Sequence, residues 1–259
     1  MQERTCYNFI IESFTLITGA SSGIGEATAR RFAKEGRNLI LIARRKGKLQ
    51  KLSSELSSST TEVIVGALDL TDHKGLETFF AGLQGKQIDA VINNAGLALG
   101  TESFDQYDFN DIQTMIDVNI TAFMRIAHLS LPFLRKSKGH LVNLGSIAGK
   151  ETYAGGTVYC ATKHFVHAFS QGLRKDILGS GVRITTIEPG RVETEFSVVR
   201  LKGDEAKAKK VYEGYRPLLP SDIADAIWYA VSRPKHVNVD EMLILPTDQA
   251  GLAVQTGKL

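Results

Sequence analysis

Cysteine is scarce in this sequence, because only Cys6 and Cys160 occur among its 259 residues. Two cysteines this far apart do not form the framework of a disulfide-rich domain, so we expect a reducing compartment, the cytoplasm. Long apolar runs are absent too, since no stretch approaches the roughly 18 residues of a membrane span. Residues 1–13 lack the basic segment followed by an apolar segment that marks a signal peptide, and we assign them no role.

An excess of charge of one sign is also missing. The 31 Lys and Arg residues and the 28 Asp and Glu residues leave a net charge of +3, and no basic stripe is evident. The densest basic cluster, Lys207–Lys210, is typical of a solvated helix face. These observations argue against nucleic acid as a partner, and no metal site is predicted.

The sequence does contain short apolar segments that alternate with longer amphipathic ones. Its composition, 43% hydrophobic and 23% charged, is that of a soluble globular protein. Strands that alternate with helices predict a doubly wound parallel sheet with helices on both faces, an α/β fold, in one domain over residues 1–259. The predicted strands are Phe14–Thr18, Asn38–Ala43, Glu62–Ala67, Ala90–Asn93, His140–Leu144, Arg183–Glu188 and Met242–Leu245.

A glycine-rich turn follows the first predicted strand and opens a helix. Its glycines let the backbone approach a pyrophosphate, and the helix N-terminus supplies N–H groups and the positive end of its dipole. The spacing is Gly-x3-Gly-x-Gly, and no Lys-Ser/Thr pair follows, which argues against a P-loop. Position near the N-terminus between a strand and a helix favours nucleotide binding over an ordinary turn. The residues concerned are Gly19, Ser21, Ser22, Gly23, Ile24 and Gly25.

The end of the second strand indicates which dinucleotide is bound. Sites for NAD place Asp or Glu there, where this sequence has Ala43 followed by Arg44 and Arg45. A carboxylate repels a 2′-phosphate, whereas guanidinium groups bind one, so we expect NADP(H). Asp69 ends the third strand, and its carboxylate either accepts from the adenine amino group or belongs to a turn.

Two further polar features lie after the middle strands. Asn93 and Asn94 precede Ala95 and Gly96 at the carboxyl edge, where open α/β sheets bind ligands, and small residues there let backbone pack against the adenosine ribose. Asn119 falls within the apolar stripe of the helix that follows residue 108. A buried amide needs a hydrogen-bond partner, so Asn119 has either a functional or a structural role.

Tyr159 and Lys163 are four residues apart in a helical segment, and Ser146 lies thirteen residues before the tyrosine. Positions i and i+4 share a helix face, so the phenol and the ammonium project side by side. A nearby positive charge lowers the pKa of a phenol, and Tyr159 is then able to exchange a proton.

Together these motifs resemble the short-chain dehydrogenase/reductase family in order and spacing, over nearly the whole chain. The resemblance also rests on Pro189 and Gly190. It implies a Rossmann-type sheet of seven strands in the order 3-2-1-4-5-6-7, and a homotetramer.

The resemblance implies a role for each site residue. Ser146 binds the substrate oxygen, Tyr159 is the general acid or base, and Lys163 lowers the tyrosine pKa and holds the nicotinamide ribose. Asn119 positions the water of a proton relay. The nicotinamide carboxamide and phosphate are lined by Pro189, Gly190, Val192 and Thr194.

The segment from residue 189 to residue 204 and the C-terminal residues resemble one branch of the family, the NADP-dependent 3-hydroxy acid dehydrogenases. That branch includes serine and allo-threonine dehydrogenases and malonic semialdehyde reductases. It implies a small hydroxy acid or aldehyde substrate, whose carboxylate needs a cationic partner. We expect Arg200, or else Arg191 or Lys150, to supply it, although a surface role for Arg200 is an equal alternative.

Two other functions remain open. One is a reductase of the same fold that acts on a bulkier substrate, such as a 3-oxoacyl thioester, a pterin or a steroid. The other is a nucleotide-binding regulator without catalysis, against which the presence of Ser146, Tyr159, Lys163 and Asn119 argues.

Overall fold

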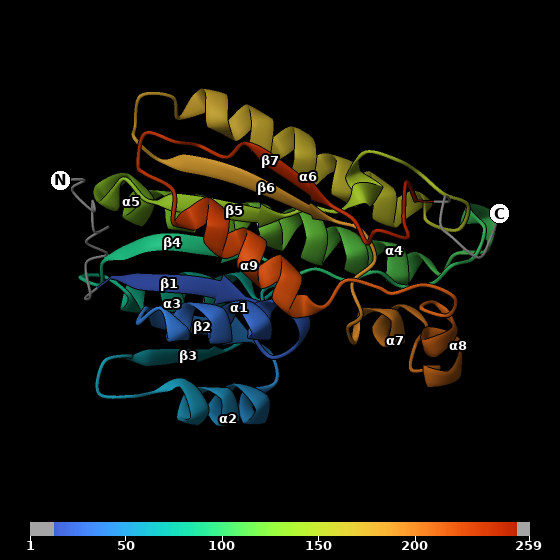
Figure 1. Ribbon diagram of the computed structural model, residues 1–259, viewed down its shortest axis with the longest axis horizontal. Helices are drawn as coiled ribbons and strands as arrows, with labels where there is room; N and C mark the ends of the chain where they lie inside the picture. Colours follow the sequence, from blue (N-terminus) through green and yellow to red (C-terminus); the bar gives the residue numbers. More distant parts are fainter. Residues whose placement is uncertain (1–12, 253–259) are drawn as a thin grey trace.

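A parallel sheet of seven strands forms the centre of the computed structural model, which describes residues 13–252 (Figure 1). The strand order is β3-β2-β1-β4-β5-β6-β7, and every neighbouring pair is parallel. The predicted fold class and strand order are confirmed. The strands are β1 (Phe14–Thr18), β2 (Asn38–Ala43), β3 (Val63–Ala67), β4 (Ile88–Asn93), β5 (His140–Leu144), β6 (Arg183–Pro189) and β7 (Glu241–Ile244).

The predicted bounds of β1, β2 and β5 agree with the observed ones, and those of β3, β4, β6 and β7 differ by one or two residues. The largest difference is at β4, which begins at Ile88 because Phe14 of β1 pairs with that residue, two positions before the predicted Ala90. The central strands are buried on both faces. In β2, for example, every residue from Asn38 to Ala43 is buried, which agrees with its nearly continuous apolar sequence.

Helices cover both faces of the sheet. The apolar side chains of α1, α2 and α9 pack on one face, and those of α3, α5 and α6 pack on the other. The long helices are α1 (Gly23–Lys34), α2 (Lys46–Leu56), α3 (His73–Gly82), α4 (Phe109–Ile116), α5 (Phe123–Ser137), α6 (Thr157–Asp176) and α9 (Pro220–Val231). Two short helices, α7 (Phe196–Arg200) and α8 (Glu205–Lys210), project beyond the carboxyl ends of the strands (Figure 1).

Local sequence explains where several helices begin. Asp72 accepts a hydrogen bond from the backbone N–H of Gly75 and so caps α3. In α9, Pro220 occupies the first turn, and Asp222 accepts from the backbone N–H of Leu219. The predicted solvated face of Lys207–Lys210 lies on α8, where the three lysines are exposed.

A π-helical turn, η2 (Asp117–Ala122), joins α4 to α5. The sequence predicted one continuous helix here. A π-turn inserts an extra residue into the helical ladder, and such turns occur frequently at functional sites. Asn119 lies in this turn and is buried, so the irregularity sets the direction of its side chain.

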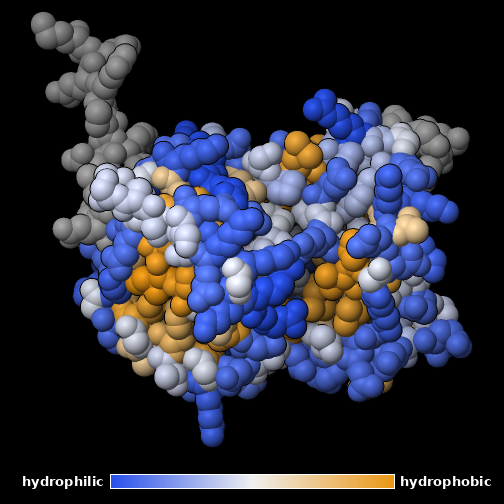
Figure 2. All heavy atoms as spheres, turned by 90° about the horizontal axis from the view of Figure 1, so that it is seen from below, coloured by the Kyte–Doolittle hydropathy of each residue, from blue (hydrophilic) through white to orange (hydrophobic). Residues whose placement is uncertain are grey.

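Some apolar surface remains exposed. Seen from below, the molecule carries two hydrophobic areas separated by a hydrophilic band (Figure 2). None of the helices formed by residues 13–252 is both long and apolar enough to cross a membrane. Cys160 is a buried free thiol. Residues 1–12, which include Cys6, lie outside the described residues. They make up all but the last residue of the N-terminal segment to which we assigned no role.

Candidate active site

A cleft of about 650 Å³ opens at the carboxyl edge of the sheet. Most of the predicted site residues line it, and Gly25, Asn119, Lys150 and Arg200 are not part of its wall. The predicted residues in the wall are Gly19, Ser21, Ser22, Gly23, Ile24, Arg44, Arg45, Asp69, Asn94, Ala95, Gly96, Ser146, Tyr159, Lys163, Pro189, Gly190, Arg191, Val192 and Thr194. The topology thus brings together residues from the ends of six strands, β1 to β6, and from helix α6.

The turn after β1 is shaped by close backbone packing. Gly19 has a φ of +68°, and a Cβ there would lie 2.8 Å from the Asn94 side-chain nitrogen. A Cβ on Gly25 would lie 2.4 Å from the carbonyl oxygen of Gly19, so only glycine lets the first turn of α1 pack this closely. The start of α1 therefore faces the cleft with its N–H groups, which is the arrangement that binds a pyrophosphate.

The β1 turn is tied to the end of β4 through Thr18. Its hydroxyl accepts hydrogen bonds from the backbone N–H groups of Asn94 and Ala95, each at 3.0 Å. The Asn94 side chain in turn donates to the Thr18 carbonyl at 2.8 Å. Thr18 begins the glycine-rich motif, but it was not among the predicted site residues.

Two arginines lie at the mouth of the cleft. Arg44 extends into solvent, with 68% of its side chain exposed, and its Nη1 lies 3.8 Å from Asp69. Arg45 is anchored by hydrogen bonds from Nε to the Ser21 hydroxyl at 3.1 Å and from Nη2 to the Ser22 hydroxyl at 2.6 Å. Both cations therefore stand beside the glycine-rich turn, where a 2′-phosphate of a bound dinucleotide would need them.

Asp69 is held by its own turn. Its carboxylate accepts from the backbone N–H and the hydroxyl of Thr71, at 2.9 and 2.8 Å. Partial burial acts to raise the pKa of Asp69, but these hydrogen bonds and Arg44 outweigh it and lower the pKa. Both readings of Asp69 thus have support, since it makes a turn and still lines the cleft.

Asn119 is fully engaged below the cleft. Its side-chain nitrogen donates to the carbonyl of Leu97 at 2.7 Å and to the hydroxyl of Thr162 at 3.1 Å, and its oxygen accepts from the Leu97 N–H at 2.9 Å. A Cβ on Gly96 would lie 3.3 Å from that oxygen and 3.7 Å from Lys163 Nζ. The amide of Asn119 and the ammonium of Lys163 therefore converge on the backbone at Gly96.

Tyr159 and Lys163 lie one turn apart on α6 and both face the cleft, as the spacing predicted. Lys163 Nζ lies 5.9 Å from the centre of the Tyr159 ring and donates to the carbonyl of Leu144 at 2.8 Å. Ser146 forms a side-chain hydrogen bond with Tyr159. Ser146, Tyr159 and Lys163 thus lie together in the cleft, and their side chains are suited to proton transfer and oxyanion stabilisation.

The electrostatics of this group correct one prediction. We expected Lys163 to lower the pKa of Tyr159, but burial raises that pKa well above its usual range, the nearby Tyr153 adds to this, and the hydrogen bond to Ser146 opposes it. Burial also lowers the pKa of Lys163 to about 8. The phenol is consequently protonated at neutral pH in this arrangement, because its desolvation outweighs the effect of nearby cations.

The segment after β6 forms the far wall. Arg191 N donates to the Gln249 side chain at 3.0 Å, and a Cβ on Gly190 would lie 2.4 Å from the same oxygen. Thr194 sits against Gly23, since a Cβ on that glycine would lie 3.3 Å from the threonine methyl group. The predicted nicotinamide segment therefore lies directly beside the glycine-rich turn.

The three predicted cations for a substrate carboxylate have different surroundings. Arg200 donates to the carbonyls of Gly100 and Gly155 and, at 2.6 Å, to the hydroxyl of Tyr153. Arg191 lines the cleft and donates to the Tyr215 hydroxyl at 3.3 Å. Contact of either arginine with a substrate stays a prediction.

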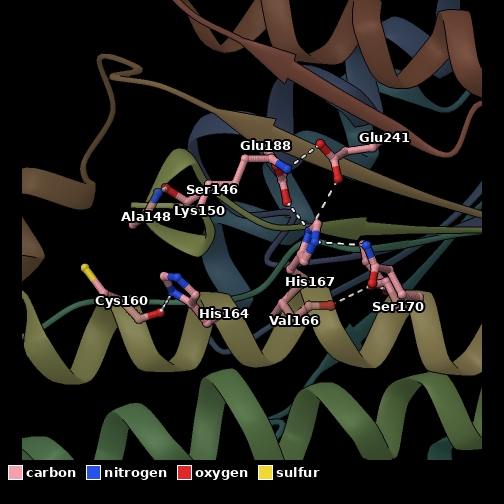
Figure 3. A network of polar contacts seen from close by, with 12 residues as sticks. Ser146, Ala148, Lys150, Cys160, His164, Val166, His167, Ser170, Glu188 and Glu241 are labelled. Carbon is pink, nitrogen blue, oxygen red and sulfur yellow. Dashed lines mark hydrogen bonds and ion pairs between the residues drawn. The ribbon is translucent and has the colours of Figure 1, made fainter. Parts of the chain in front are cut away.

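Lys150, the third candidate, instead contacts a cluster formed by the buried Glu188 and the more exposed Glu241 and His167 (Figure 3). Its ammonium pairs with Glu188 at 3.2 Å and with Glu241 at 2.5 Å, and His167 Nδ1 lies 2.9 Å from Glu188. These His and Glu side chains could together ligate a metal ion, but the ammonium of Lys150 already supplies a cation between the two carboxylates.

Several wall residues were missed by sequence reasoning. Tyr153 and Phe196 both flank Tyr159, and the rings of Phe196 and Tyr159 are 5.5 Å apart. Glu195 also lines the cleft, where it pairs with Arg45. The sequence did contain one signal for Tyr153, the pair Gly155 and Gly156 before α6. In the structure, a Cβ on Gly156 would lie 2.4 Å from the Tyr153 ring, so the glycine makes room for that ring.

Comparison with known proteins agrees with this geometry. Residues 13–204 match the family model described as short chain dehydrogenase. Serine 3-dehydrogenase of Agrobacterium fabrum is 46% identical over 237 residues, which cover 91% of this chain and 94% of that protein. NADP-dependent 3-hydroxy acid dehydrogenase YdfG of Escherichia coli is 42% identical over 245 residues, covering 92% and 98%.

A solved structure gives the same result. The closed form of serine dehydrogenase complexed with NADP+ superposes with a TM-score of 0.87 at 42% identity, and the match covers 93% of this chain and 99% of that chain. On the family match, these relatives and the shared fold, the chain belongs to the short-chain dehydrogenase family.

Proposed function

We propose that this protein is an NADP(H)-dependent oxidoreductase that transfers a hydride between the cofactor and the hydroxyl-bearing carbon of a small 3-hydroxy acid. The observation that carries the proposal is the meeting of Ser146, Tyr159 and Lys163 in a cleft whose mouth bears Arg44 and Arg45. The relatives named serine 3-dehydrogenase and NADP-dependent 3-hydroxy acid dehydrogenase support the substrate class.

The cofactor assignment rests on shape and charge. The close packing at Gly19 and Gly25 leaves room for a pyrophosphate at the start of α1, and the two arginines complement a 2′-phosphate. Asp69, Asn94, Ala95 and Gly96 then face the adenosine. When bound, the nicotinamide ring supplies the hydride chemistry, and the protein orients it.

The chain's own groups handle the proton and the developing charge. Tyr159 donates its proton to the substrate oxygen in reduction and accepts it in oxidation, and its raised pKa keeps the proton in place beforehand. Ser146 donates a hydrogen bond to the same oxygen and stabilises negative charge there. Lys163 holds the nicotinamide ribose, and Asn119 fixes the backbone at Leu97 beside the ammonium.

The substrate carboxylate needs a cation within the cleft. Arg191 lines the wall of the cleft, whereas Arg200 is not part of the wall and donates to the hydroxyl of Tyr153. We therefore assign the carboxylate to Arg191 first and keep Arg200 as the second candidate. A bulkier carbonyl substrate is the alternative function, because Leu97, Val118, Val199 and Leu252 make part of the wall apolar.

A panel of reactions followed by the absorbance of reduced nicotinamide tests the proposal. Serine, allo-threonine, 3-hydroxypropionate and 3-hydroxybutyrate are offered with NADP and with NAD, and acetoacetyl thioesters and pterins are offered with NADPH. We expect turnover of the hydroxy acids with NADP, and a loss of about 10²–10⁴-fold in kcat for Tyr159→Phe. Preferred turnover of the thioesters or pterins would establish the alternative, and undiminished Tyr159→Phe activity would remove Tyr159 from the mechanism.

Three broader assignments belong to the same proposal. The chain forms one domain, which the single seven-stranded sheet supports. The protein works in the cytoplasm, which the unpaired thiol of Cys160 supports. It assembles as a homotetramer, which is supported by exposed apolar side chains on α4, α9 and β7, namely Phe109, Tyr229 and Leu243.

A further inference from the structure

Both carboxylate oxygens of Glu195 form ion pairs with cations on the opposite side of the cleft mouth. Its Oε2 lies 2.7 Å from Arg45 Nη1, and its Oε1 lies 2.7 Å from Lys48 Nζ. Glu195 comes from the segment between β6 and α7, whereas the two cations come from the start of α2. The bridge therefore spans the cleft between segments about 150 residues apart in sequence.

The contacts of Arg45 resemble those that a phosphate group would need. Besides Glu195, its guanidinium binds the hydroxyls of Ser21 and Ser22 in the glycine-rich turn. The guanidinium of Arg45 thus lies against the glycine-rich turn, and Lys48 adds a second positive charge on the same side of the cleft. A carboxylate that bridges an arginine and a lysine in this way presents anionic oxygens where a phosphate monoester would present its own.

The carboxylate of Glu195 stays ionised, but its ion pairs contribute little free energy. The hydrogen bonds from Lys48 and then Arg45 lower the pKa of Glu195 to about 2, so the carboxylate stays ionised at physiological pH. All three side chains are about half exposed, at 47%, 44% and 50% for Glu195, Arg45 and Lys48. Exposed ion pairs contribute little, so an anion of higher charge can displace the carboxylate.

We propose that Glu195 is a specificity-determining residue that competes with the 2′-phosphate of the cofactor for Arg45 and Lys48. This inference rests on the proposed function, which places the 2′-phosphate at these cations. A phosphate with nearly two negative charges and three acceptor oxygens displaces the carboxylate, and a ligand without that phosphate leaves it in position. Glu195 therefore limits how strongly phosphorylated ligands are preferred.

Two adenosine ligands isolate the effect without catalysis. Adenosine 2′,5′-bisphosphate and AMP differ only in the 2′-phosphate, and calorimetric titration gives the affinity of each for the full-length protein. We expect Glu195→Gln to tighten binding of the bisphosphate by about three- to tenfold, because it removes a competitor bound through two exposed ion pairs. Binding of AMP should stay within about twofold, as expected for a ligand that does not touch the bridge.

Glu193→Gln is the matched control. Glu193 lies two residues earlier in the same segment, is exposed, and takes part in none of the ion pairs among residues 13–252. It loses the same charge without freeing Arg45, so it should leave both affinities nearly unchanged. In an Arg45→Met, Lys48→Met background, Glu195→Gln should likewise have no effect.

The outcomes separate the two claims. If the wild-type protein binds the bisphosphate no better than AMP, the phosphate site itself is misplaced, and this inference fails with the proposed function. If the wild type prefers the bisphosphate but Glu195→Gln behaves like Glu193→Gln, or weakens bisphosphate binding, only the competition is refuted. The competition is supported if Glu195→Gln tightens bisphosphate binding, Glu193→Gln does not, and the effect disappears when Arg45 and Lys48 are both replaced by Met.

Discussion

At the scale of single residues, Lys163 shows how burial changes the chemistry of a charged group. The side chain is 7% exposed, and desolvation lowers its pKa to about 8 from the ordinary 10.5. Its ammonium donates a hydrogen bond to the carbonyl of Leu144 and forms no ion pair with a carboxylate among residues 13–252. The folded protein therefore binds this proton less tightly than the unfolded chain does.

This gives a prediction for stability against pH. Between about pH 8 and pH 10.5 the unfolded state binds more protons at Lys163, so the contribution of Lys163 to stability becomes more favourable as pH rises through this window. Relative to Lys163→Met, the wild-type free energy of unfolding should gain roughly 2–3 kcal/mol across it. Urea denaturation at several pH values measures the difference.

An exposed lysine on the same helix is the control. Lys175 lies near the end of α6 and faces solvent. Lys175→Met should follow the wild type at every pH, because the side chain of Lys175 is exposed to water in the folded protein. Parallel curves for Lys163→Met and the wild type would show that the ammonium of Lys163 is not desolvated.

The sequence predicted which residues meet but not what their surroundings do to them. Helical spacing alone placed Tyr159 beside Lys163, because i and i+4 share a face. The raised pKa of Tyr159 depends on packing by Phe196 and other distant residues, and spacing carries no information on that. Glu195 was missed for a related reason, since its cationic partners lie about 150 residues away.

At the scale of elements, Glu188 connects the parts that carry the catalytic side chains. It is completely buried in β6, one residue before Pro189, and its stem lies against Gly145, since a Cβ on that glycine would be 3.1 Å away. Its carboxylate contacts Lys150, four residues after Ser146, and His167, four residues after Lys163 (Figure 3). Burial raises the pKa of Glu188, and both partners oppose that rise.

Removing the lysine from this cluster should be costly. Lys150→Met leaves the buried carboxylate of Glu188 with less compensation, so we expect a loss of about 1–3 kcal/mol in unfolding free energy at pH 7. The loss should shrink toward pH 5, because a raised carboxyl pKa lets Glu188 take up a proton and become neutral. Chemical denaturation at both pH values measures it.

The double variant is the internal control for this cluster. Adding Glu188→Gln to Lys150→Met removes the uncompensated charge and should recover most of the loss at pH 7. If the double variant is as unstable as the sum of the single ones, the two side chains do not interact, and Lys150 stabilises the fold only through Glu241.

Elements were predictable where their pattern was long or strongly apolar. Buried strands such as Asn38–Ala43 are nearly continuous apolar runs, so their existence followed from the sequence pattern, whereas their order in the sheet came from the resemblance to the family. The π-turn at Asp117–Ala122 was not predicted, because one inserted residue barely disturbs an apolar stripe. The short helix α7 was missed as well, since five residues give too little periodicity.

At the scale of the whole molecule, the sheet leaves an edge that needs explanation. Among residues 13–252, β6 is the one strand that pairs with β7, so the outer edge of this four-residue strand is unpaired. Leu243 lies on it with 46% exposure. An uncovered edge with an apolar side chain favours pairing with another chain. The edge therefore supports the proposed tetramer, in which each two-fold interface uses the same surface of both partners.

The last prediction concerns this assembly. Light scattering coupled to gel filtration should give the wild type a mass of about four times the 28.3 kDa of one chain. Leu243→Glu puts a charge at the β7 edge and should reduce the mass to about half, because one kind of interface is lost and the other remains. Leu178→Glu makes the same change at a leucine that is 86% exposed just after α6, and it should leave the mass unchanged. A wild-type monomer would refute the tetramer, and a Leu243→Glu protein of unchanged mass would remove β7 from its interface.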